Sequence, residues 1–191
     1  MKCLTIKRLF DILLALTALS FFCLPMMVIA CIVRLTSDGP AIYWSVRVGR
    51  YNRNFLMPKF RTMTIHAPTL ATHLLQNGQE YTTSVGGVLR RTSLDELPQL
   101  WSILLGKMSF VGPRPALFNQ YDLIELRTKA GVHTLLPGLT GWAQVNGRDE
   151  LSITDKVNLD VKYMNGMSMA LDLKILWKTV FRVIRSDEIS H

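Results

Sequence analysis

Two adjacent acids, Asp95 and Glu96, stand in the segment "SLDEL", directly after Arg90 and Arg91. Neighbouring carboxylates repel each other, and an apolar run follows this pair, so their proximity needs a cause. A local cause is available, because Ser93 and Glu96 have the spacing of a capping box and acids are favoured at a helix N-terminus. The local pattern therefore predicts a capped helix start, and it leaves a chemical role for the two acids open.

Cations suited to phosphate surround the acid pair, and several occupy constrained loops. Arg114 stands between Pro113 and Pro115, and Arg148 follows a glycine. A guanidinium offers a planar pair of donors that fits phosphate oxygens, and a restricted backbone lowers the cost of positioning it. Each cation alone is typical of a solvated surface, but together they make a phosphate site credible. The set is Lys59, Arg61, Arg90, Arg91, Arg114 and Arg148.

Residues 12–33 form an uncharged apolar segment, which predicts that the protein, and with it any phosphate site, is attached to a membrane. The segment is long enough to cross a bilayer as a helix. Pro25 lies in its middle, where a proline removes a backbone hydrogen bond and kinks the helix, and both flanks are positive. A helix over residues 1–35 that bends at Pro25 and leaves on the face where it entered satisfies both flanks, so a re-entrant hairpin is predicted. A plain span, a cleaved secretory signal and a lipoprotein-type cleavage site at Cys31 remain alternatives.

Positive charge is concentrated in the N-terminal third of the 191-residue chain, whose net charge is +8. Residues 1–63 hold nine Lys and Arg against Asp11 and Asp38, a net charge of +7, and the remainder holds thirteen bases against twelve acids. Such a distribution favours an anionic partner near the start: a membrane surface, a nucleic acid or a phosphorylated substrate. Asp11 is expected to pair with Lys7 or Arg8, one turn earlier.

The cysteines and histidines do not suggest a site by their spacing. Cys3, Cys23 and Cys31 lie in or beside the apolar segment, with neither a disulfide framework nor the spacing of zinc ligands. The four histidines are scattered along the chain, so no histidine-based metal site is expected.

One domain is predicted after a boundary near residue 35, since the remaining chain is long enough to bury a core. Residues 37–63 indicate short strands, interrupted at Gly39-Pro40 and by a polar turn around Asn52.

Three later segments have distinct patterns. Residues 97–105 predict an apolar helix that ends near Gly106, whereas the prolines within 109–117 predict an irregular stretch. Near the C-terminus, apolar and basic residues recur at helical spacing, which predicts an amphipathic helix. Such a helix lies either in a membrane interface beside anionic lipids or with its basic face in water. Its apolar members are Leu173, Leu176, Val180, Phe181 and Ile184, and its basic members are Lys174, Lys178, Arg182 and Arg185.

Several blocks of this chain resemble the monotopic phosphoglycosyl transferases, the bacterial sugar transferases that begin surface-glycan assembly on a polyprenol carrier. The blocks "KRLFDILLAL", "RVGR", "KFRTM", "RRTSLDELPQLWSILLGKMSFVGPRP", "PGLTGWAQVNGR" and "LDLKIL" occur in that order and, with the central proline, cover nearly the whole chain. The acid pair followed by "MSFVGPRP" is highly specific. The length resembles the minimal catalytic form of the family.

The resemblance implies transfer of a sugar-1-phosphate from a UDP-sugar, expected to be an N-acetylated amino sugar, to polyprenol phosphate, with release of UMP. Asp95 matches the nucleophile of a two-step reaction, and an aspartate can serve as a covalent phosphoryl relay. Glu96 matches the second acid. The family requires Mg²⁺, which commonly takes one or two carboxylates plus substrate phosphates, so Asp95 and Glu96 are the expected metal ligands. The matched substrate-binding set is Lys59, Arg61, Arg90, Arg114, Arg148 and Asp172.

The fold that the resemblance implies is α/β but mostly helical: a re-entrant membrane helix over 1–35 and a compact catalytic domain over 36–191, with a small strand element and interfacial amphipathic helices. The implied location is the bacterial inner membrane, with the active site on the cytoplasmic face, where UDP-sugars are made. The implied partners are a UDP-sugar, polyprenol phosphate and anionic inner-membrane lipids. Downstream glycosyltransferases are a further partner class that the resemblance allows, and no nucleic acid is expected.

An alternative from another class is a membrane-anchored binding or regulatory protein. Its basic N-terminal third would hold anionic lipid or nucleic acid, and the acid pair would be only a helix cap. The enzyme is favoured, because a binder needs neither an acid pair nor an arginine fixed between prolines.

Overall fold

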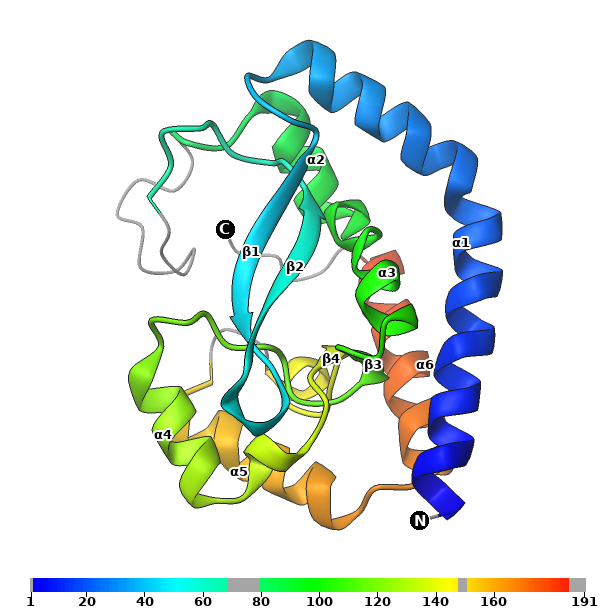
Figure 1. Ribbon diagram of the computed structural model, residues 1–191, viewed down its shortest axis with the longest axis vertical. Coiled ribbons are helices and arrows are strands. Elements are labelled where there is room, and N and C mark those ends of the chain that lie inside the picture. Colours follow the sequence, from blue (N-terminus) through cyan, green and yellow to red (C-terminus); the bar gives the residue numbers. More distant parts are fainter. Residues whose placement is uncertain (1, 69–79, 148–150, 186–191) are drawn as a thin grey trace.

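The longest element is the N-terminal helix α1 (Lys2–Thr36), which runs along one side of the molecule (Figure 1). The computed structural model describes residues 2–68, 80–147 and 151–185. The other helices are α2 (Ser84–Arg91), α3 (Gln99–Leu104), α4 (Tyr121–Lys129), α5 (Ile153–Asn165) and α6 (Met169–Arg185). Single 3₁₀ turns are η1 (Arg50–Asn52), η3 (Leu94–Glu96), η4 (Val132–Thr134) and η5 (Gln144–Asn146). The strands are β1 (Ile42–Val48), β2 (Asn54–Phe60), β3 (Ser109–Val111) and β4 (Gly138–Thr140). The expectation of a mostly helical α/β fold with a small strand element is confirmed.

Helix α1 continues through Pro25 without a break in its secondary structure, and its path bends in its second half (Figure 1). The sequence predicted a re-entrant helix hairpin broken at Pro25, whereas the structure has one continuous, bent helix. The difference is physical: a proline removes one hydrogen bond and kinks a helix, but the turns on either side can keep their own bonds. Apolar side chains around the proline are exposed, including Phe21 and Leu24, and the helix is long and apolar enough to cross a membrane.

The short strands that the sequence predicted on either side of a polar turn are β1 and β2, and they pair as an antiparallel hairpin, with Ile42 opposite Phe60 and Val48 opposite Asn54. The turn between them is tight, since Tyr51 and Asn52 both have positive φ. In this register Tyr43 lies opposite Lys59 and Arg47 opposite Phe55. Because side chains alternate between the faces of a strand, Arg47 and Lys59 share one face of the hairpin.

Strands β3 and β4 form a short parallel pair, with Ser109 opposite Gly138 and Val111 opposite Thr140. The sequence predicted an irregular stretch from 109 onward, and this was wrong for residues 109–111, because the prolines constrain only the residues that follow the strand. Close backbone packing explains a glycine here: a Cβ on Gly138 would lie 2.2 Å from the backbone nitrogen of Gly112. The close β3–β4 pairing thus fixes the position at which the loop that follows β3 begins. We call this loop, residues 112–117, the Arg114 loop.

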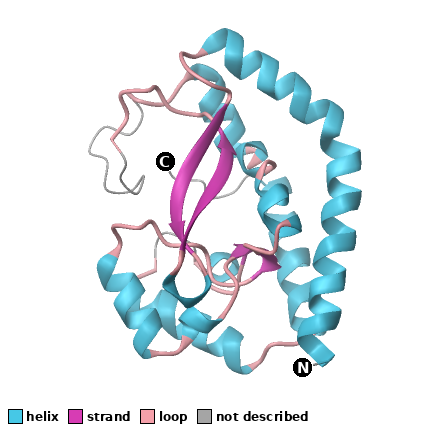
Figure 2. Cartoon of the chain, viewed as in Figure 1, coloured by secondary structure: helices cyan, strands magenta, loops and turns pink. Residues whose placement is uncertain are grey.

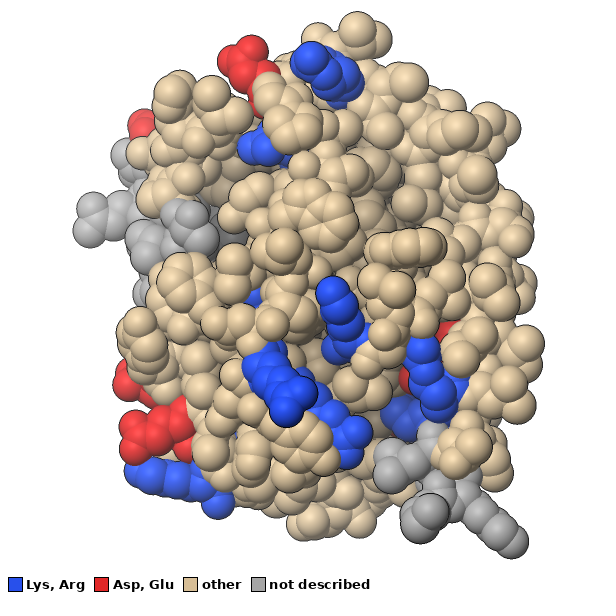
Figure 3. All heavy atoms as spheres, viewed as in Figure 1, with Lys and Arg blue, Asp and Glu red and all other residues tan. Residues whose placement is uncertain are grey.

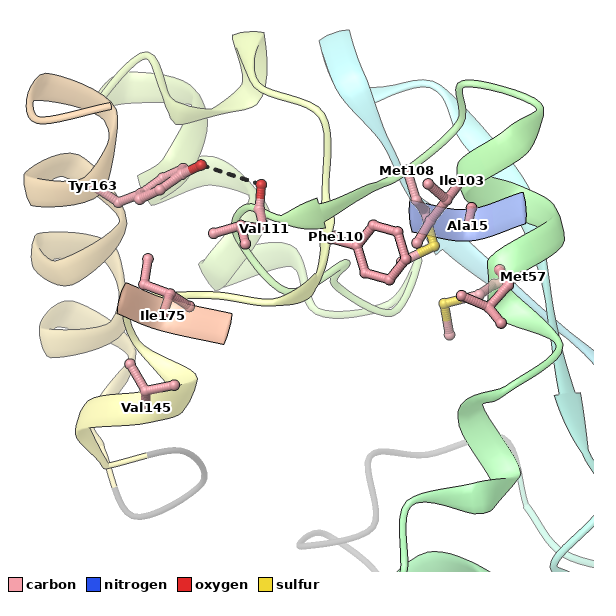
Figure 4. Close-up of a cluster of buried hydrophobic side chains, with 10 residues drawn as sticks. Ala15, Met57, Ile103, Met108, Phe110, Val111, Val145, Tyr163 and Ile175 are labelled. Carbon is pink, nitrogen blue, oxygen red and sulfur yellow. Dashed lines mark hydrogen bonds between the residues drawn. The ribbon is translucent and has the colours of Figure 1, made fainter. Parts of the chain in front are cut away.

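The main hydrophobic core joins side chains from all along the chain (Figure 4), and the elements that carry them include both helices and strands (Figure 2). Its buried members are Ala15, Met57, Leu100, Ile103, Met108, Phe110, Val111, Val145, Tyr163 and Ile175. A second cluster buries Val33, near the end of α1, against Phe60 and Leu89. Helix α1 therefore packs on the same domain near its start, through Ala15, and near its end, through Val33.

Candidate active site

The acid pair lies in the single turn η3, between α2 and α3. Ser93, which precedes the turn, has a left-handed backbone (φ 57°), and its side chain makes no capping hydrogen bond. The predicted capping box is therefore absent from this turn, because the left-handed backbone of Ser93 does not give the extended conformation that an N-cap needs. The acids need another explanation, and their partners supply it.

Glu96 binds two cations from distant parts of the chain. Its Oε1 accepts hydrogen bonds from Lys59 Nζ at 2.8 Å and from Arg114 Nη2 at 2.9 Å. Burial alone would raise the pKa of Glu96, but the charges and hydrogen bonds of Lys59 and Arg114 outweigh it and hold the pKa well below its usual range. Glu96 is therefore a fixed anion that orients both cations toward one point.

Asp95 lies beside this cluster and is buried, with 7% of its surface exposed. Lys59 Nζ lies 3.8 Å from Asp95 Oδ2, so this lysine contacts both carboxylates. Burial raises the pKa of Asp95; the charge of Lys59 opposes this shift and that of Glu96 adds to it, and the net direction is upward. A carboxylate of raised basicity beside several cations suits nucleophilic attack on phosphorus, where developing negative charge needs stabilisation.

Of two further cations predicted for the site, Arg90 lies near the acid pair, whereas Arg61 has other partners. Arg90, at the end of α2, donates from Nε to Thr62 Oγ1 at 2.9 Å. Burial lowers the pKa of Arg90, while the charge of Asp95 raises it, which places Arg90 in the electrostatic field of the acid pair. Arg61 instead donates to the carbonyl of Pro40 and stacks over the ring of Tyr43. Arg148 lies outside the described residues.

Asp172 has structural partners. Its carboxylate accepts from Lys7 Nζ at 2.5 Å and from the Tyr163 hydroxyl at 2.7 Å. Lys7 also donates to the carbonyl of Val111 at 3.0 Å. Asp172 therefore joins α6 to the start of α1 and to β3, and the structure does not bring it into the Lys59–Glu96–Arg114 cluster.

The pairing predicted for Asp11 is wrong. Its Oδ1 accepts from the backbone N–H of Phe110 at 3.1 Å, and Arg8 donates to the carbonyls of Ile103 and Leu104. The last carbonyls of a helix have no i+4 partner within the helix, so they can accept the guanidinium; that of Ile103 also accepts from the N–H of Gly106. Tertiary partners therefore replace the local pair that the one-turn spacing suggested.

Two half-buried arginines near the cluster were missed by the sequence analysis as individual site residues. Arg47 on β1 donates from Nη1 to the carbonyl of Pro115 at 3.2 Å, and burial, followed by the charge of Arg114, lowers its pKa to about 10. Arg127 on α4 donates from Nη1 to the carbonyl of Arg114 at 2.7 Å and binds Asp160. Strand alternation beside Lys59 could have indicated Arg47. No local pattern links Arg127 with Asp160.

The acid pair also has the chemistry of a magnesium site. Among the residues that the structure describes, no group of three or more His, Cys, Asp and Glu could hold a metal. Mg²⁺ bound with a diphosphate needs only one or two carboxylates, since phosphate oxygens and water complete its shell. Asp95 and Glu96 are adjacent and offer hard oxygen ligands, so they fit an ion that arrives with the substrate.

Lys and Arg side chains gather in the lower half of the face shown in Figure 3, and the largest group of acids visible there lies at the left edge. This distribution agrees with an anionic ligand. The arrangement as a whole combines a buried carboxylate, a second carboxylate that orients two cations, and positive charge around both.

Comparison with known proteins agrees with this chemistry. The family model described as "Bacterial sugar transferase" matches residues 2–186. The chain is 39% identical over 186 residues to an uncharacterized sugar transferase EpsL of Bacillus subtilis (strain 168), covering 97% of this chain and 91% of that protein. It is 41% identical over 190 residues to a UDP-glucose:undecaprenyl-phosphate glucose-1-phosphate transferase of Escherichia coli (strain K12), covering 93% of this chain and 40% of that protein.

A third relative, from Aeromonas hydrophila, is named UDP-N-acetylgalactosamine-undecaprenyl-phosphate N-acetylgalactosaminephosphotransferase. It is 36% identical over 185 residues, covering 94% of this chain and 44% of its own length. This chain thus spans less than half of the two relatives with named substrates. Since the family model covers nearly the whole chain, the protein belongs to the bacterial sugar transferase family.

Proposed function

We propose that this protein transfers a sugar-1-phosphate from a UDP-sugar to polyprenol phosphate, releasing UMP, through a covalent phosphosugar–Asp95 intermediate. The observation that carries the proposal is the cluster at η3: buried Asp95 beside Lys59, with Glu96 holding Lys59 and Arg114. A binding protein for anionic lipid has no need of a buried acid among its cations, because that acid would weaken anion binding.

The reaction has two displacements at the same phosphorus atom. An Asp95 oxygen attacks the β-phosphorus of the UDP-sugar, the bond from that phosphorus to the bridging oxygen breaks, and UMP leaves with the bond's electron pair. An oxygen of polyprenol phosphate then attacks the same phosphorus, and the Asp95 carboxylate leaves. In this proposal Lys59 and Arg114, which both contact Glu96, stabilise charge on the phosphoryl oxygens in both steps, and Arg90 adds to the positive field.

Mg²⁺ bound by Asp95 and Glu96 would supply further charge neutralisation on the diphosphate. Glu96 already holds two cations through Oε1, so its second oxygen is the natural ligand in this arrangement. Arg148 enters the proposal as a further diphosphate ligand from the sequence alone.

The sugar is proposed to be an N-acetylated amino sugar, as in the name of the Aeromonas hydrophila relative. The Escherichia coli relative is named for glucose, so both classes must be compared. The product would be the lipid-linked starting unit of a surface polysaccharide.

A re-entrant path for α1 is part of the proposal. Lys7 and Arg8, near the start of α1, bond to Asp172 and to the end of α3, while Val33, near its end, is buried against α2 and β2. A straight helix of 35 residues is about 50 Å long and would separate its ends across a bilayer. Since both ends contact one domain, the site and both ends of α1 are proposed to share the cytoplasmic face.

An exposed apolar strip on α6 supports contact with the membrane surface. Leu173, Trp177, Val180 and Phe181 are all more than 40% exposed. Basic side chains lie beside them, and Lys178 stacks over Trp142. This pairing of apolar and basic groups suits a helix that lies among anionic headgroups.

Thiol labelling tests the topology. In a background without Cys3, Cys23 and Cys31, we expect Lys2→Cys and Ser37→Cys both to resist an impermeant thiol reagent in intact cells and both to react after permeabilisation. Labelling of the Lys2→Cys variant in intact cells would contradict the re-entrant path and indicate an ordinary span.

The activity itself is tested with membrane fractions, polyprenol phosphate, Mg²⁺ and a set of radiolabelled UDP-sugars. We expect UMP release and transfer of label to the organic phase, greatest with an N-acetylated amino sugar, and loss of both with EDTA. Absence of UMP and of lipid-linked label with every UDP-sugar would contradict the proposed reaction.

A further inference from the structure

The loop that carries Arg114 is held by two half-buried arginines that donate to consecutive backbone carbonyls. Arg127 Nη1 donates to the carbonyl of Arg114 at 2.7 Å, and Arg47 Nη1 donates to the carbonyl of Pro115 at 3.2 Å. Hydrogen bonds from charged donors are stronger than neutral ones, and these two act on adjacent residues from opposite parts of the fold.

Each of these arginines is itself fixed. Arg127 binds Asp160 on α5 through both Nε and Nη2, at 2.9 and 2.7 Å, and the two side chains are 11% and 2% exposed. Arg47 donates from Nε to Ser45 Oγ at 3.0 Å, on the same face of β1. The hydrogen bond to the Pro115 carbonyl therefore comes from the β1–β2 hairpin, and the hydrogen bond to the Arg114 carbonyl comes from α4, whose arginine is held by α5.

The flanking prolines do not perform this task. A proline fixes φ, but it does not determine where the loop lies relative to η3. The Arg114 side chain must reach Glu96, to which it bonds at 2.9 Å, and 37% of its side-chain surface is exposed, so it is also open to a ligand. Its backbone needs independent anchors for this geometry to be kept.

We propose that Arg47 and the Arg127–Asp160 pair are positioning residues that hold the Arg114 loop in register with Glu96. The effect on catalysis rests on the proposed function, in which Arg114 contacts the diphosphate, whereas the effect on the loop does not. Neither arginine is assigned contact with substrate.

A double-mutant cycle tests this role. Arg127→Lys keeps the charge beside Asp160 but offers a single nitrogen, which cannot serve both Asp160 and the Arg114 carbonyl in the fork geometry. We expect kcat/KM for UMP release to fall about 10- to 100-fold in the wild-type background but less than about threefold in an Arg114→Lys background, since groups acting through one residue are not additive. Losses that multiply, or no loss in the wild-type background, would overturn the proposal.

Arg50→Lys is the matched control. Arg50 also donates to a backbone carbonyl, that of Thr134 at 2.7 Å, but it is exposed, and its other partner is the ring of Tyr51 rather than a carbonyl of the Arg114 loop. Its replacement is expected to change kcat/KM by less than about twofold. Arg47→Lys is the second test variant, and its kcat/KM should fall in the same way as that of Arg127→Lys in both backgrounds. The conclusion then does not depend on a single substitution.

Amide exchange separates this proposal from the proposed reaction. The N–H of Val48 bonds to the carbonyl of Ala116, and that of Gly138 bonds to the carbonyl of Pro113, so both amides report on the loop. Hydrogen–deuterium exchange at these two amides should be more than about tenfold faster in both lysine variants, while the Arg61 amide, bonded to the carbonyl of Ala41, keeps its rate. Unchanged exchange would overturn the positioning role. Faster exchange in a protein that releases no UMP would instead retain the positioning role and reject the reaction.

Discussion

Replacement of Asp95 by asparagine is expected to lower the rate of UMP release by roughly four orders of magnitude or more, the size of loss seen when a covalent nucleophile is removed. Asparagine keeps the size and polarity of the side chain but has no anionic oxygen to attack phosphorus. The loss of UMP release should be the same with and without polyprenol phosphate, because the substitution blocks the first displacement. Single-turnover UMP release from the UDP-sugar measures it.

The fold of this variant should be retained. Burial raises the pKa of Asp95, which means that the charged form is costly at this position, so a neutral side chain of the same shape is tolerated in the folded state. Asp122→Asn, at an exposed acid in the first turn of α4, is the control and should keep full activity. Turnover by Asp95→Asn at a rate near that of the control would assign Asp95 a structural role only.

Replacement of Arg114 by lysine is expected to lower kcat/KM by about 10- to 1,000-fold, or roughly 1.4 to 4 kcal/mol of transition-state stabilisation. The guanidinium can bond to Glu96 through one nitrogen and present others to phosphate oxygens, whereas an ammonium is a single point charge. Steady-state UMP release over a range of UDP-sugar concentrations separates kcat from KM.

The control for this variant is Arg53→Lys, an exposed arginine after the hairpin turn. It changes the same chemical group without touching Glu96, so its kcat/KM should match that of the unmodified protein. If Arg114→Lys also keeps the full kcat/KM, the guanidinium fork has no part in catalysis and Arg114 serves the fold alone.

Much of the secondary structure could be predicted because its causes are local. The sequence of residues 37–63 predicted short strands and a polar turn around Asn52, which are β1, β2 and the turn between them, and the apolar run after Glu96 predicted α3. The three-residue strand β3 was missed, because it exists through its pairing with β4, about thirty residues later. A pattern within one short segment cannot reveal such a partner.

The site was predictable in its residue types but not in its connections. The acid pair and the proline-flanked Arg114 are visible in the sequence, and the structure joins them through Glu96. The local rules misassigned Ser93 as a cap and paired Asp11 with its neighbours, because tertiary contacts outweigh local spacing at both positions. The Arg127–Asp160 pair shows the same limit: it connects two helices whose sequences carry no sign of each other.

The central claim, a covalent phosphosugar on Asp95, is tested most directly by mass spectrometry of the protein after reaction with its UDP-sugar in the absence of polyprenol phosphate. The account predicts an intact-protein mass increase equal to one sugar phosphate, release of a matching amount of UMP, and peptide mapping of the adduct to Asp95. Addition of polyprenol phosphate should remove the adduct and yield the lipid-linked sugar. Product formation without any adduct, or an adduct on a residue other than Asp95, would contradict the account.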